Sequence, residues 1–461
     1  MWRLNACLRL KPLAVALKRL AAPRRVFNLA ITTSLNTCSV RSHHCEYDLQ
    51  DAFAALRYRD FSIVTINQFC LTLAILIQEI IVAYSLYQIT KDPLTLGLIG
   101  LAEAIPFIAL SLWGGYFADK LNKQSIMKVC LFFSFPLPLV LWYLFHSYDH
   151  GQIGVTTLSW GIYAVIFALG TIRGFYNPSA TSLKPFLIPR ELYANGATWT
   201  TIGWQSGVII GPMLGGFMLA GIGRENSLLS VSMLLFICFC LITLLKKRTF
   251  PTMEQDNLWD SLSEGFRFIW KTKIVLWAIS LDLVSVLFGG VIALLPIFAE
   301  DILKVGPEGL GYLRAAPSIG ALITMIALTK FPPTHHAWRN MLIAVAGFGI
   351  FTIIFACSNN LWLSLFALGM TGACDSISVV VRQTILQVYP PENMRGRVAA
   401  VNGMFVSSSN ELGAFESGLA AKYLGTITAT IFGGCMTMAV VAISWIKTAD
   451  LFSVDITKGQ K

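Results

Sequence analysis

Eight charged side chains lie within long apolar stretches of this sequence, where a charge is costly to keep. They are Glu79, Glu103, Arg173, Asp282, Asp375, Arg382, Glu411 and Glu416. A charge at the centre of a bilayer costs about 2.5–3.5 kcal/mol on insertion scales. A carboxyl group removed from water holds its proton more tightly, so it can take up a proton on one side of a membrane and release it on the other. These residues predict a path for protons or substrate.

Each of these charges could instead form a buried ion pair or a hydrogen bond between helices. Glu411 and Glu416 are five residues apart and do not share a helical face, so we expect at most one of them to line a path. Asp375 and Arg382 are seven residues apart, on one face, and could pair through a third group. Spacing alone leaves a structural and a functional role open for all of them.

The stretches that hold these charges are long enough to cross a membrane. Hydrophobic residues make up 55% of the 461 and charged residues only 13%, whereas a soluble domain carries roughly 25% charged residues. Runs of about 18 or more apolar residues span a bilayer as helices. The sequence predicts an all-α polytopic membrane protein with twelve such helices, at about 62–88, 95–118, 126–146, 153–177, 192–221, 227–245, 274–300, 309–329, 338–357, 360–388, 398–421 and 426–446.

The basic residues predict the orientation of these helices. Most of the 35 Lys and Arg fall on one side, which the positive-inside rule makes cytoplasmic together with both termini; the other side keeps Lys91, Arg224 and Lys304. This bias accounts for the net charge of +10, so no nucleic-acid partner is expected. The cysteines show no disulfide spacing, and His43-His44-Cys45 offers too few ligands for a metal site. We expect no metal and no cofactor.

The chain divides into two halves of six helices each. We expect a basic tail at 1–57, a first bundle at 58–246, a cytoplasmic linker at 247–272, a second bundle at 273–447 and a tail at 448–461. Gly211, Gly215 and Gly216 match Gly413, Ser417 and Gly418 at a constant offset, which indicates duplication. In the linker, an apolar residue recurs every four positions, which predicts an amphipathic helix at the membrane surface, with Leu258, Leu262, Phe266 and Trp270 on one face.

Two glycine motifs stand out from this pattern. Glycines at four-residue intervals in the fifth helix predict close approach of another helix, with a bend at Pro212; the motif comprises Gly203, Gly207, Gly211, Pro212, Gly215 and Gly216. The loop after the second helix reads WGGYFADKLNKQ, in which Gly114 and Gly115 would let helices approach. We interpret it as a cytoplasmic hinge, formed by Gly115, Asp119, Lys120 and Lys123.

These motifs resemble those of the major facilitator superfamily. GYFADKLNK is similar to its loop motif after the second helix, and GVIIGPMLGG to the fifth-helix motif of the drug:proton antiporter branch. Arg173 falls where that branch carries a fourth-helix arginine. In the second half, LFGGVIALLPIFAEDILKVGPEGLGYLRAAPSIGA resembles bacterial relatives of the enterobactin exporter. The corresponding loop of the second half, KFPPTHHAWRN, departs from the pattern because it has no aspartate, so the first half would carry the hinge alone.

The resemblance implies an alternating-access secondary transporter, most often an exporter driven by protons. It implies that the first helix of each trio lines a cavity, which would place Glu79 and Asp282 there, with Glu103 beside it and Arg173 in coupling. The implied substrate is an amphipathic small molecule that is drug- or siderophore-like, and the implied setting is the bacterial inner membrane, with the protein as a monomer.

Other functions remain open or are disfavoured by specific residues. An ATP-driven pump would need a GxxxxGK[ST] loop, which is absent. A membrane enzyme would need a reactive cluster, yet no histidine lies inside a predicted span, His146 being only at the edge of one. A lysolipid flippase, or a scaffold or receptor on the same fold, is the alternative. Residues 1–50 are basic and could be a targeting segment, a tail or an upstream extension of the reading frame.

Overall fold

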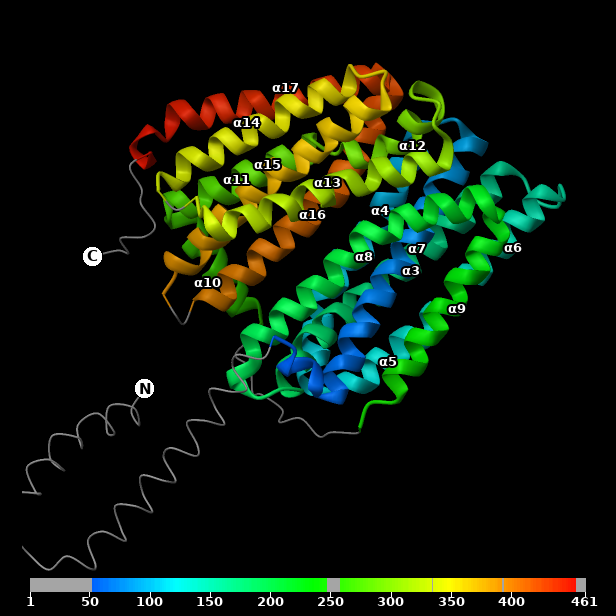
Figure 1. Cartoon of the computed structure of the whole chain (residues 1–461), viewed down its shortest axis with the longest axis horizontal. Helices are drawn as coiled ribbons and strands as arrows, with labels where there is room; N and C mark the ends of the chain where they lie inside the picture. The colour runs from blue at the N-terminus through cyan, green and yellow to red at the C-terminus, as the bar shows by residue number, and fades with distance from the viewer. Residues whose placement is uncertain (1–51, 247–257, 334, 392–393, 453–461) are drawn as a thin grey trace, which may run out of the picture.

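The computed structural model describes residues 52–246, 258–333, 335–391 and 394–452 of the chain. The basic tail with His43-His44-Cys45, the first part of the linker and the end of the C-terminal tail lie outside these ranges. Every regular element in the described ranges is helical (Figure 1).

In the first half, the described residues form seven α-helices that make up six spans. The third span is broken where Pro136 and Pro138 interrupt the helix, because proline removes a backbone donor and clashes with the preceding turn. The helices are α3 (Arg59–Thr90), α4 (Pro93–Lys120), α5 (Lys123–Ser134), α6 (Leu137–Asp149), α7 (Val155–Leu183), α8 (Tyr193–Gly221) and α9 (Gly223–Thr243), with short 3-10 turns η1 (Ala54–Arg57), η2 (Lys184–Phe186) and η3 (Arg190–Leu192).

The second half follows the linker helix α10 (Leu258–Lys271) and also has six spans. Its first span is not the continuous helix that the sequence predicts: α11 (Lys273–Phe288) ends at Gly289-Gly290, and the chain continues irregularly. The remaining elements are η4 (Val291–Leu294), α12 (Leu295–Ile297), the π-helical turn η5 (Phe298–Ile302), α13 (Gly306–Lys330), α14 (Ala337–Ala356), α15 (Leu361–Val388), α16 (Arg395–Leu424), α17 (Thr426–Lys447) and the turn η6 (Ala449–Leu451).

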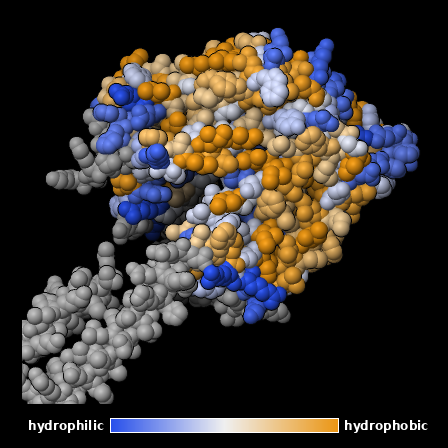
Figure 2. All heavy atoms as spheres, viewed as in Figure 1, coloured by the Kyte–Doolittle hydropathy of each residue, from blue (hydrophilic) through white to orange (hydrophobic). Residues whose placement is uncertain are grey.

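The helices are long and apolar enough to make this a polytopic membrane protein. Eleven stretches of the described residues meet the length and hydropathy that a span needs. The twelfth is α16, a helix of 30 residues that carries more charge, with Arg395, Arg397, Glu411, Glu416 and Lys422. Large apolar side chains such as Trp160, Met233 and Ile326 are more than 60% exposed, and the space-filling view shows broad apolar surface on the face that it presents (Figure 2). Such a surface suits contact with lipid tails.

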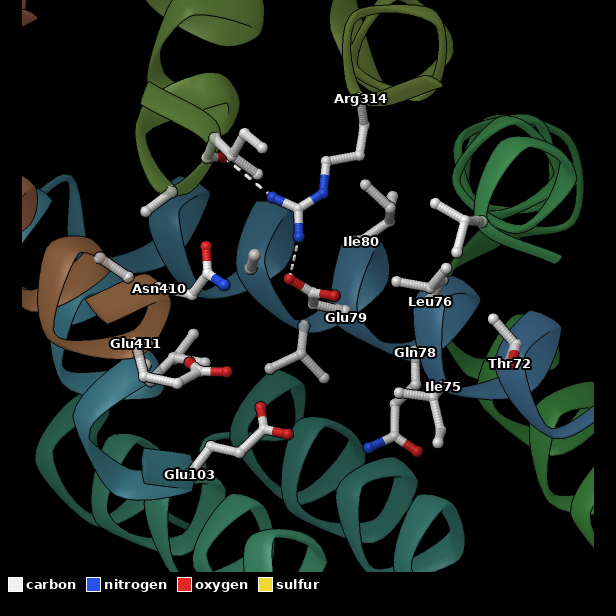
Figure 3. A pocket seen from close by; sticks show the side chains of 18 of the residues that line it. Thr72, Ile75, Leu76, Gln78, Glu79, Ile80, Glu103, Arg314, Asn410 and Glu411 are labelled. Atoms are coloured by element: carbon white, nitrogen blue, oxygen red, sulfur yellow. Dashed lines mark hydrogen bonds and ion pairs between the residues drawn. The ribbon is translucent and has the colours of Figure 1, made fainter. Parts of the chain in front are cut away.

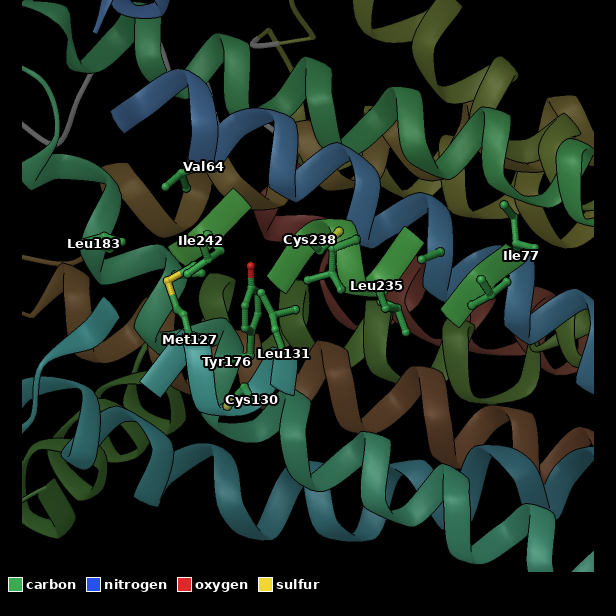
Figure 4. Packing of buried hydrophobic residues seen from close by; sticks show 14 of the residues in the cluster. Val64, Ile77, Met127, Cys130, Leu131, Tyr176, Leu183, Leu235, Cys238 and Ile242 are labelled. Atoms are coloured by element: carbon green, nitrogen blue, oxygen red, sulfur yellow. The ribbon is translucent and has the colours of Figure 1, made fainter. Parts of the chain in front are cut away.

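Each half has its own buried core. In the first half, Met127 and Leu131 of α5 meet Tyr176 of α7 and Leu235 and Ile242 of α9 (Figure 4). In the second half, the buried cluster contains Trp338, Val345 and Ile385 among others. A third cluster joins the halves, and it includes Tyr84 and Tyr87 of α3 with Phe298 and Leu310 from the second half.

The linker helix α10 packs against the second half. Gly265 faces the backbone of Arg397 in α16, and Arg397 forms an ion pair with Glu264. Phe266 and Trp270 are 46% and 66% exposed, respectively, on the face that the sequence predicts to be apolar. The side chains of Leu258 and Leu262 lie outside the described part of the structure.

The glycines of α8 lie against α3. A Cβ added at Gly207 would lie 2.8 Å from Cβ of Thr72, one at Gly211 would lie 3.0 Å from Cβ of Leu76, and Gly203 and Gly215 face the same helix. These contacts leave little room for a side chain at Gly207, Gly211 and Gly215, whereas a Cβ at Gly203 would make ordinary contacts. Gly216 points elsewhere, into α13, where an added Cβ would collide with the carbonyl oxygen of Pro307. The motif therefore serves packing within the first half and contact between the halves.

We expect Gly207→Ala to destabilise the protein by about 1–3 kcal/mol, because the added methyl group overpacks the α3–α8 seam. The measurement is the unfolding midpoint of the purified protein in detergent. Gly221→Ala is the matched control on the same helix, since a Cβ there meets nothing within 4 Å. Equal midpoints for the two variants would contradict close packing at Gly207.

Candidate functional site

A cavity of about 620 Å³ lies between the two halves, within the size range of small-molecule sites. Its wall is mostly apolar and draws on both halves. Among the described residues, six charged ones, three from each half, line it: Glu79, Glu103, Arg173, Arg314, Asp375 and Glu411. Figure 3 shows the carboxyl groups of Glu79, Glu103 and Glu411 around a common space, with Arg314 reaching in from α13.

Two ion pairs hold four of these charges. Glu103 of α4 pairs with Arg173 of α7, so this pair lies within the first half, and the Arg173 guanidinium also sits 5.5 Å from the ring centre of Phe107. Glu79 of α3 pairs with Arg314 of α13, so this pair joins the two halves. Each arginine thus keeps a counterion in an apolar setting, where an unpaired charge would be strongly unfavourable.

The other two carboxyl groups, those of Asp375 and Glu411, make no hydrogen bond or ion pair with any described residue. Glu411 lies within electrostatic range of Arg173, Arg314 and Glu79. It reaches the cavity because α16 packs closely on α4: a Cβ at Gly100 would lie 2.9 Å from Cβ of Ala414 and 3.3 Å from the carbonyl oxygen of Glu411. The site therefore contains two acids available for a proton or a cation.

Arg314 is the cavity residue that the sequence analysis left out of its candidates. A repeat could have revealed it, because Arg314 stands three residues before Pro317 in α13, as Glu103 stands three residues before Pro106 in α4. Each of these two helices is the second span of its half. The repeat therefore places charges of opposite sign at matching positions. Its partner, 235 residues away, is not apparent from periodicity.

Asp282 and Arg382 are placed differently from the expected path. They form an ion pair with each other, between α11 and α15, and their side chains are only 6% and 3% exposed. Neither lines the cavity, so Asp282 does not match Glu79, and Arg382 pairs with Asp282 rather than with Asp375. Glu416 is also outside the cavity wall, which leaves Glu411 as the charged α16 residue among those that line the cavity.

The cavity is closed at the end of the molecule that carries Lys91, here called the Lys91 end. Tyr84 and Tyr87 of α3 donate hydrogen bonds to Glu300 and Asp301 of η5, respectively. The Lys91 ammonium lies 3.1 Å from Asp301. Burial lowers the pKa of Lys91, but hydrogen bonds and the charges of Asp301 and Glu300 outweigh it, so the pKa is raised. These polar contacts tie the halves together at this end.

A second contact closes the same end. Lys422 at the end of α16 pairs with Asp92 before α4 at 2.8 Å. Just inside this pair, Gly97 and Gly418 bring the two helix backbones together, since a Cβ at Gly418 would lie 2.8 Å from Cα of Gly97. The apolar cluster that joins the halves continues here, since it includes Leu96 of α4 and Ala421 of α16, so the two helices meet through backbone contact and buried side chains.

The opposite end, which carries α10, is open. Figure 2 shows the hollow between the halves at this end, and Figure 1 shows the two groups of helices apart there. The hydrogen bonds and ion pairs found between described residues of the two halves lie at the Lys91 end or near the cavity. The cavity is therefore accessible from the α10 end in this conformation.

The predicted hinge lies at the α10 end, between α4 and α5. Gly114 packs against the backbone of Gly174 in α7, whereas Gly115 has nothing within 4 Å of an added Cβ, so close approach depends on Gly114 alone. The Lys123 ammonium is buried and donates to the Ala118 carbonyl at 2.8 Å, and Lys120 contacts Tyr116. The side chain of Asp119 lies outside the described part of the structure.

Two helical bundles around a central cavity that is closed at one end, with paired charges in its wall, are typical of membrane transporters. The chain belongs to the transmembrane secretion effector family of the major facilitator superfamily, whose sequence profile matches residues 50–455. This is a family of membrane transporters, which places the chain among transporters of small molecules.

Two individual proteins that are similar in sequence to this chain are also transporters. The chain is 24% identical to the multidrug efflux pump Tap of Mycolicibacterium fortuitum over 364 residues, 73% of this chain and 83% of that protein. It is 28% identical to the enterobactin exporter EntS of Shigella boydii over 252 residues, 53% of this chain and 59% of that protein. The second similarity thus spans little more than half of the exporter's length.

Solved structures show the same fold at low sequence identity. A bacterial homologue of the human lysosomal transporter Spinster, inward-facing and occupied, superposes with a TM-score of 0.67 at 13% identity, over 88% of this chain and 99% of that one. An inward-facing bacterial homologue of the iron transporter ferroportin superposes with a TM-score of 0.64 at 13% identity, over 83% and 99%. These similarities support the twelve-helix architecture.

We expect Asp282→Asn to destabilise the second half by about 3–5 kcal/mol, because it leaves the Arg382 guanidinium buried without a counterion. The measurement is the midpoint of thermal aggregation of the detergent-solubilised protein. The double variant Asp282→Leu, Arg382→Met should recover much of the loss, since an apolar pair replaces the ions. A double variant less stable than the single one would contradict a structural role for this pair.

Proposed function

We propose that this protein exports an amphipathic small molecule from the cytoplasm in exchange for protons. It works by alternating access, as a monomer in a bacterial inner membrane with both termini in the cytoplasm. The observation that carries the proposal is the cavity between the halves. Its wall is mostly apolar, and its carboxyl groups outnumber its guanidinium groups.

The charges of the cavity favour coupling to a cation such as the proton. Four carboxyl groups, those of Glu79, Glu103, Asp375 and Glu411, face only two guanidinium groups, those of Arg173 and Arg314. Two carboxylates would therefore remain unneutralised in a poorly solvated site, which is unfavourable. Binding of protons removes this cost, and their release to the other side of the membrane makes the gradient useful for transport.

The orientation follows from the basic residues. The α10 end carries most of the Lys and Arg of the loops, and the Lys91 end few, so the α10 end faces the cytoplasm. The conformation with a closed Lys91 end is then the inward-facing one, in which cargo enters from the cytoplasm.

The two halves that move against each other correspond to two domains. These are the bundles at 58–246 and 273–447, joined by a linker at 247–272.

The relatives support export rather than uptake. Tap is a multidrug efflux pump and EntS is an enterobactin exporter, so a drug- or siderophore-like cargo is the natural first choice for this chain. The mostly apolar wall supports an amphipathic cargo, because such walls bury apolar surface while a few polar groups orient the molecule.

The test uses the full chain reconstituted in liposomes, with ethidium and enterobactin as separate probes. We expect at least one probe to accumulate in vesicles with an acidic lumen, several-fold above protein-free liposomes. Protein molecules whose cytoplasmic face points outward would exchange lumenal protons for the probe. Nigericin, which collapses the pH gradient, should abolish the accumulation. Accumulation that is unaffected by nigericin would contradict proton coupling, and movement of neither probe would contradict this cargo class.

The hinge proposal gives a separate expectation for Asp119. The second half offers no corresponding aspartate in its loop, so the single hinge has no substitute. We expect Asp119→Asn to lower the turnover of transport about tenfold while the apparent affinity for the probe stays within about twofold, because the change affects conformational exchange and not the cavity. Initial rates over a range of probe concentrations measure both. A selective loss of affinity would contradict a hinge role.

A further inference from the structure

Arg314 is held by both halves of the protein at once. One nitrogen of its guanidinium donates to the Ile292 carbonyl of its own half at 3.0 Å, and the other pairs with Glu79 of the first half. Glu79 lies on α3, the helix whose end forms the closed Lys91 end through Tyr84 and Tyr87. Opening of the Lys91 end moves α3 away from the second half, so the Glu79–Arg314 pair must break.

A second carboxylate is available to Arg314 within its own half. Glu411 of α16 lines the same cavity, lies within electrostatic range of Arg314 and has no hydrogen bond or ion pair with any described residue. If the halves move as rigid bodies, the helices that carry Arg314 and Glu411 stay together, so only the side chains need to turn. An arginine left unpaired in this apolar cavity would be strongly unfavourable, which favours such an exchange of partners.

We propose that Arg314 exchanges Glu79 for Glu411 when the Lys91 end opens, and that the cargo is an amphipathic organic cation whose positive charge occupies Glu411 while Arg314 is on Glu79. This inference rests on the proposed exchange of protons for cargo, and it specifies the chemical class of that cargo.

This change of ion-pair partner couples the export of the cation to the entry of the proton through one guanidinium group. In the inward-facing state Arg314 neutralises Glu79, and the cation from the cytoplasm binds the Glu411 carboxylate. In the outward-facing state Arg314 takes Glu411, the cation leaves to the outside, and the freed Glu79 carboxylate binds a proton from the outside. Return of Arg314 to Glu79 releases this proton to the cytoplasm. One proton therefore enters for each monovalent cation that leaves, with no net charge moved.

The other charged groups around Glu79 and Glu411 are compatible with this cycle. Glu103 and Arg173 form a pair within the first half, so motion between the halves does not separate them. Asp375 of α15 is the remaining acid of the cavity wall, and the electrostatic influences on Glu411 come from Arg173, Glu79 and Arg314. The exchange therefore involves one acid from each half and one arginine.

The first test follows hydrogen–deuterium exchange of the full chain in nanodiscs, at peptides covering 84–92 and 298–305 of the Lys91 end. Glu79→Gln imitates the protonated acid and removes the inward-facing partner of Arg314. Deuterium uptake by the peptides of the Lys91 end should therefore rise several-fold above that of the unmodified protein. Glu411→Gln removes the outward-facing partner, so exchange should fall. Glu416→Gln is the matched control on α16, outside the cavity, and should change neither peptide. If deuterium uptake changes in the same direction in both variants, or changes in neither, the proposal that Arg314 changes its partner is overturned.

The second test measures ethidium, a permanent monovalent cation, in binding and transport. Glu411→Gln should weaken ethidium binding to the purified protein at least tenfold, and Glu416→Gln less than twofold. In liposomes, a potential imposed with potassium and valinomycin at equal pH should leave the initial rate of ethidium exchange within twofold. A rate that follows the potential would overturn the one-for-one exchange, and unaltered binding in Glu411→Gln would overturn the site of the cation.

The two proposals can fail separately. If a pH gradient drives neither ethidium nor enterobactin, proton-coupled export fails, while hydrogen–deuterium exchange still decides whether Arg314 changes partners. If the gradient drives transport but the variants shift alike, proton-coupled export stands and the exchange of partners fails. Transport of enterobactin without ethidium would overturn the cationic class of the cargo and leave proton-coupled export in place.

Discussion

The cost of a charge in an apolar interior is the constraint on which this structure depends. The protein meets it by pooling six charges in one cavity and pairing four of them. Pairing Glu103 with Arg173 fixes α4 against α7 within one half, but pairing Glu79 with Arg314 links the two halves. The same electrostatic requirement therefore stiffens a bundle in one place and connects two moving bodies in another.

Small residues decide which contacts are permanent and which can open. Along the α3–α8 seam, Gly207 and Gly211 receive side chains of the neighbouring helix, and the fit continues over several turns. At the Lys91 end, Gly97 and Gly418 meet backbone to backbone, and polar side chains at the surface complete the closure. Surface ion pairs are each worth roughly 0–1 kcal/mol, so the apolar cluster around Tyr84, Phe298 and Leu310 contributes more to this closure than the ion pairs do.

The sequence predicted the spans and most of the cavity charges because hydropathy and the cost of buried charge are local properties. Pairing is not local. Arg314 and Glu79 stand far apart in the chain, and Asp282 and Arg382 come from different spans, so spacing on one helix could not show that one pair faces the cavity and the other is buried in a bundle. The break after Phe288 was missed because Gly289-Gly290 lies within an otherwise continuous apolar run.

That break places an exposed backbone carbonyl group beside Arg314. The Ile292 carbonyl, just after the break, accepts the Leu295 N–H within the turn η4 and also accepts a hydrogen bond from the Arg314 guanidinium. A second nitrogen of the guanidinium is left for Glu79. In the first half α3 runs unbroken through the corresponding region, and Glu103, which stands in place of an arginine, pairs with Arg173 instead. The irregular helix thus gives the second half an arginine anchored at one nitrogen and free to choose its acid with the other.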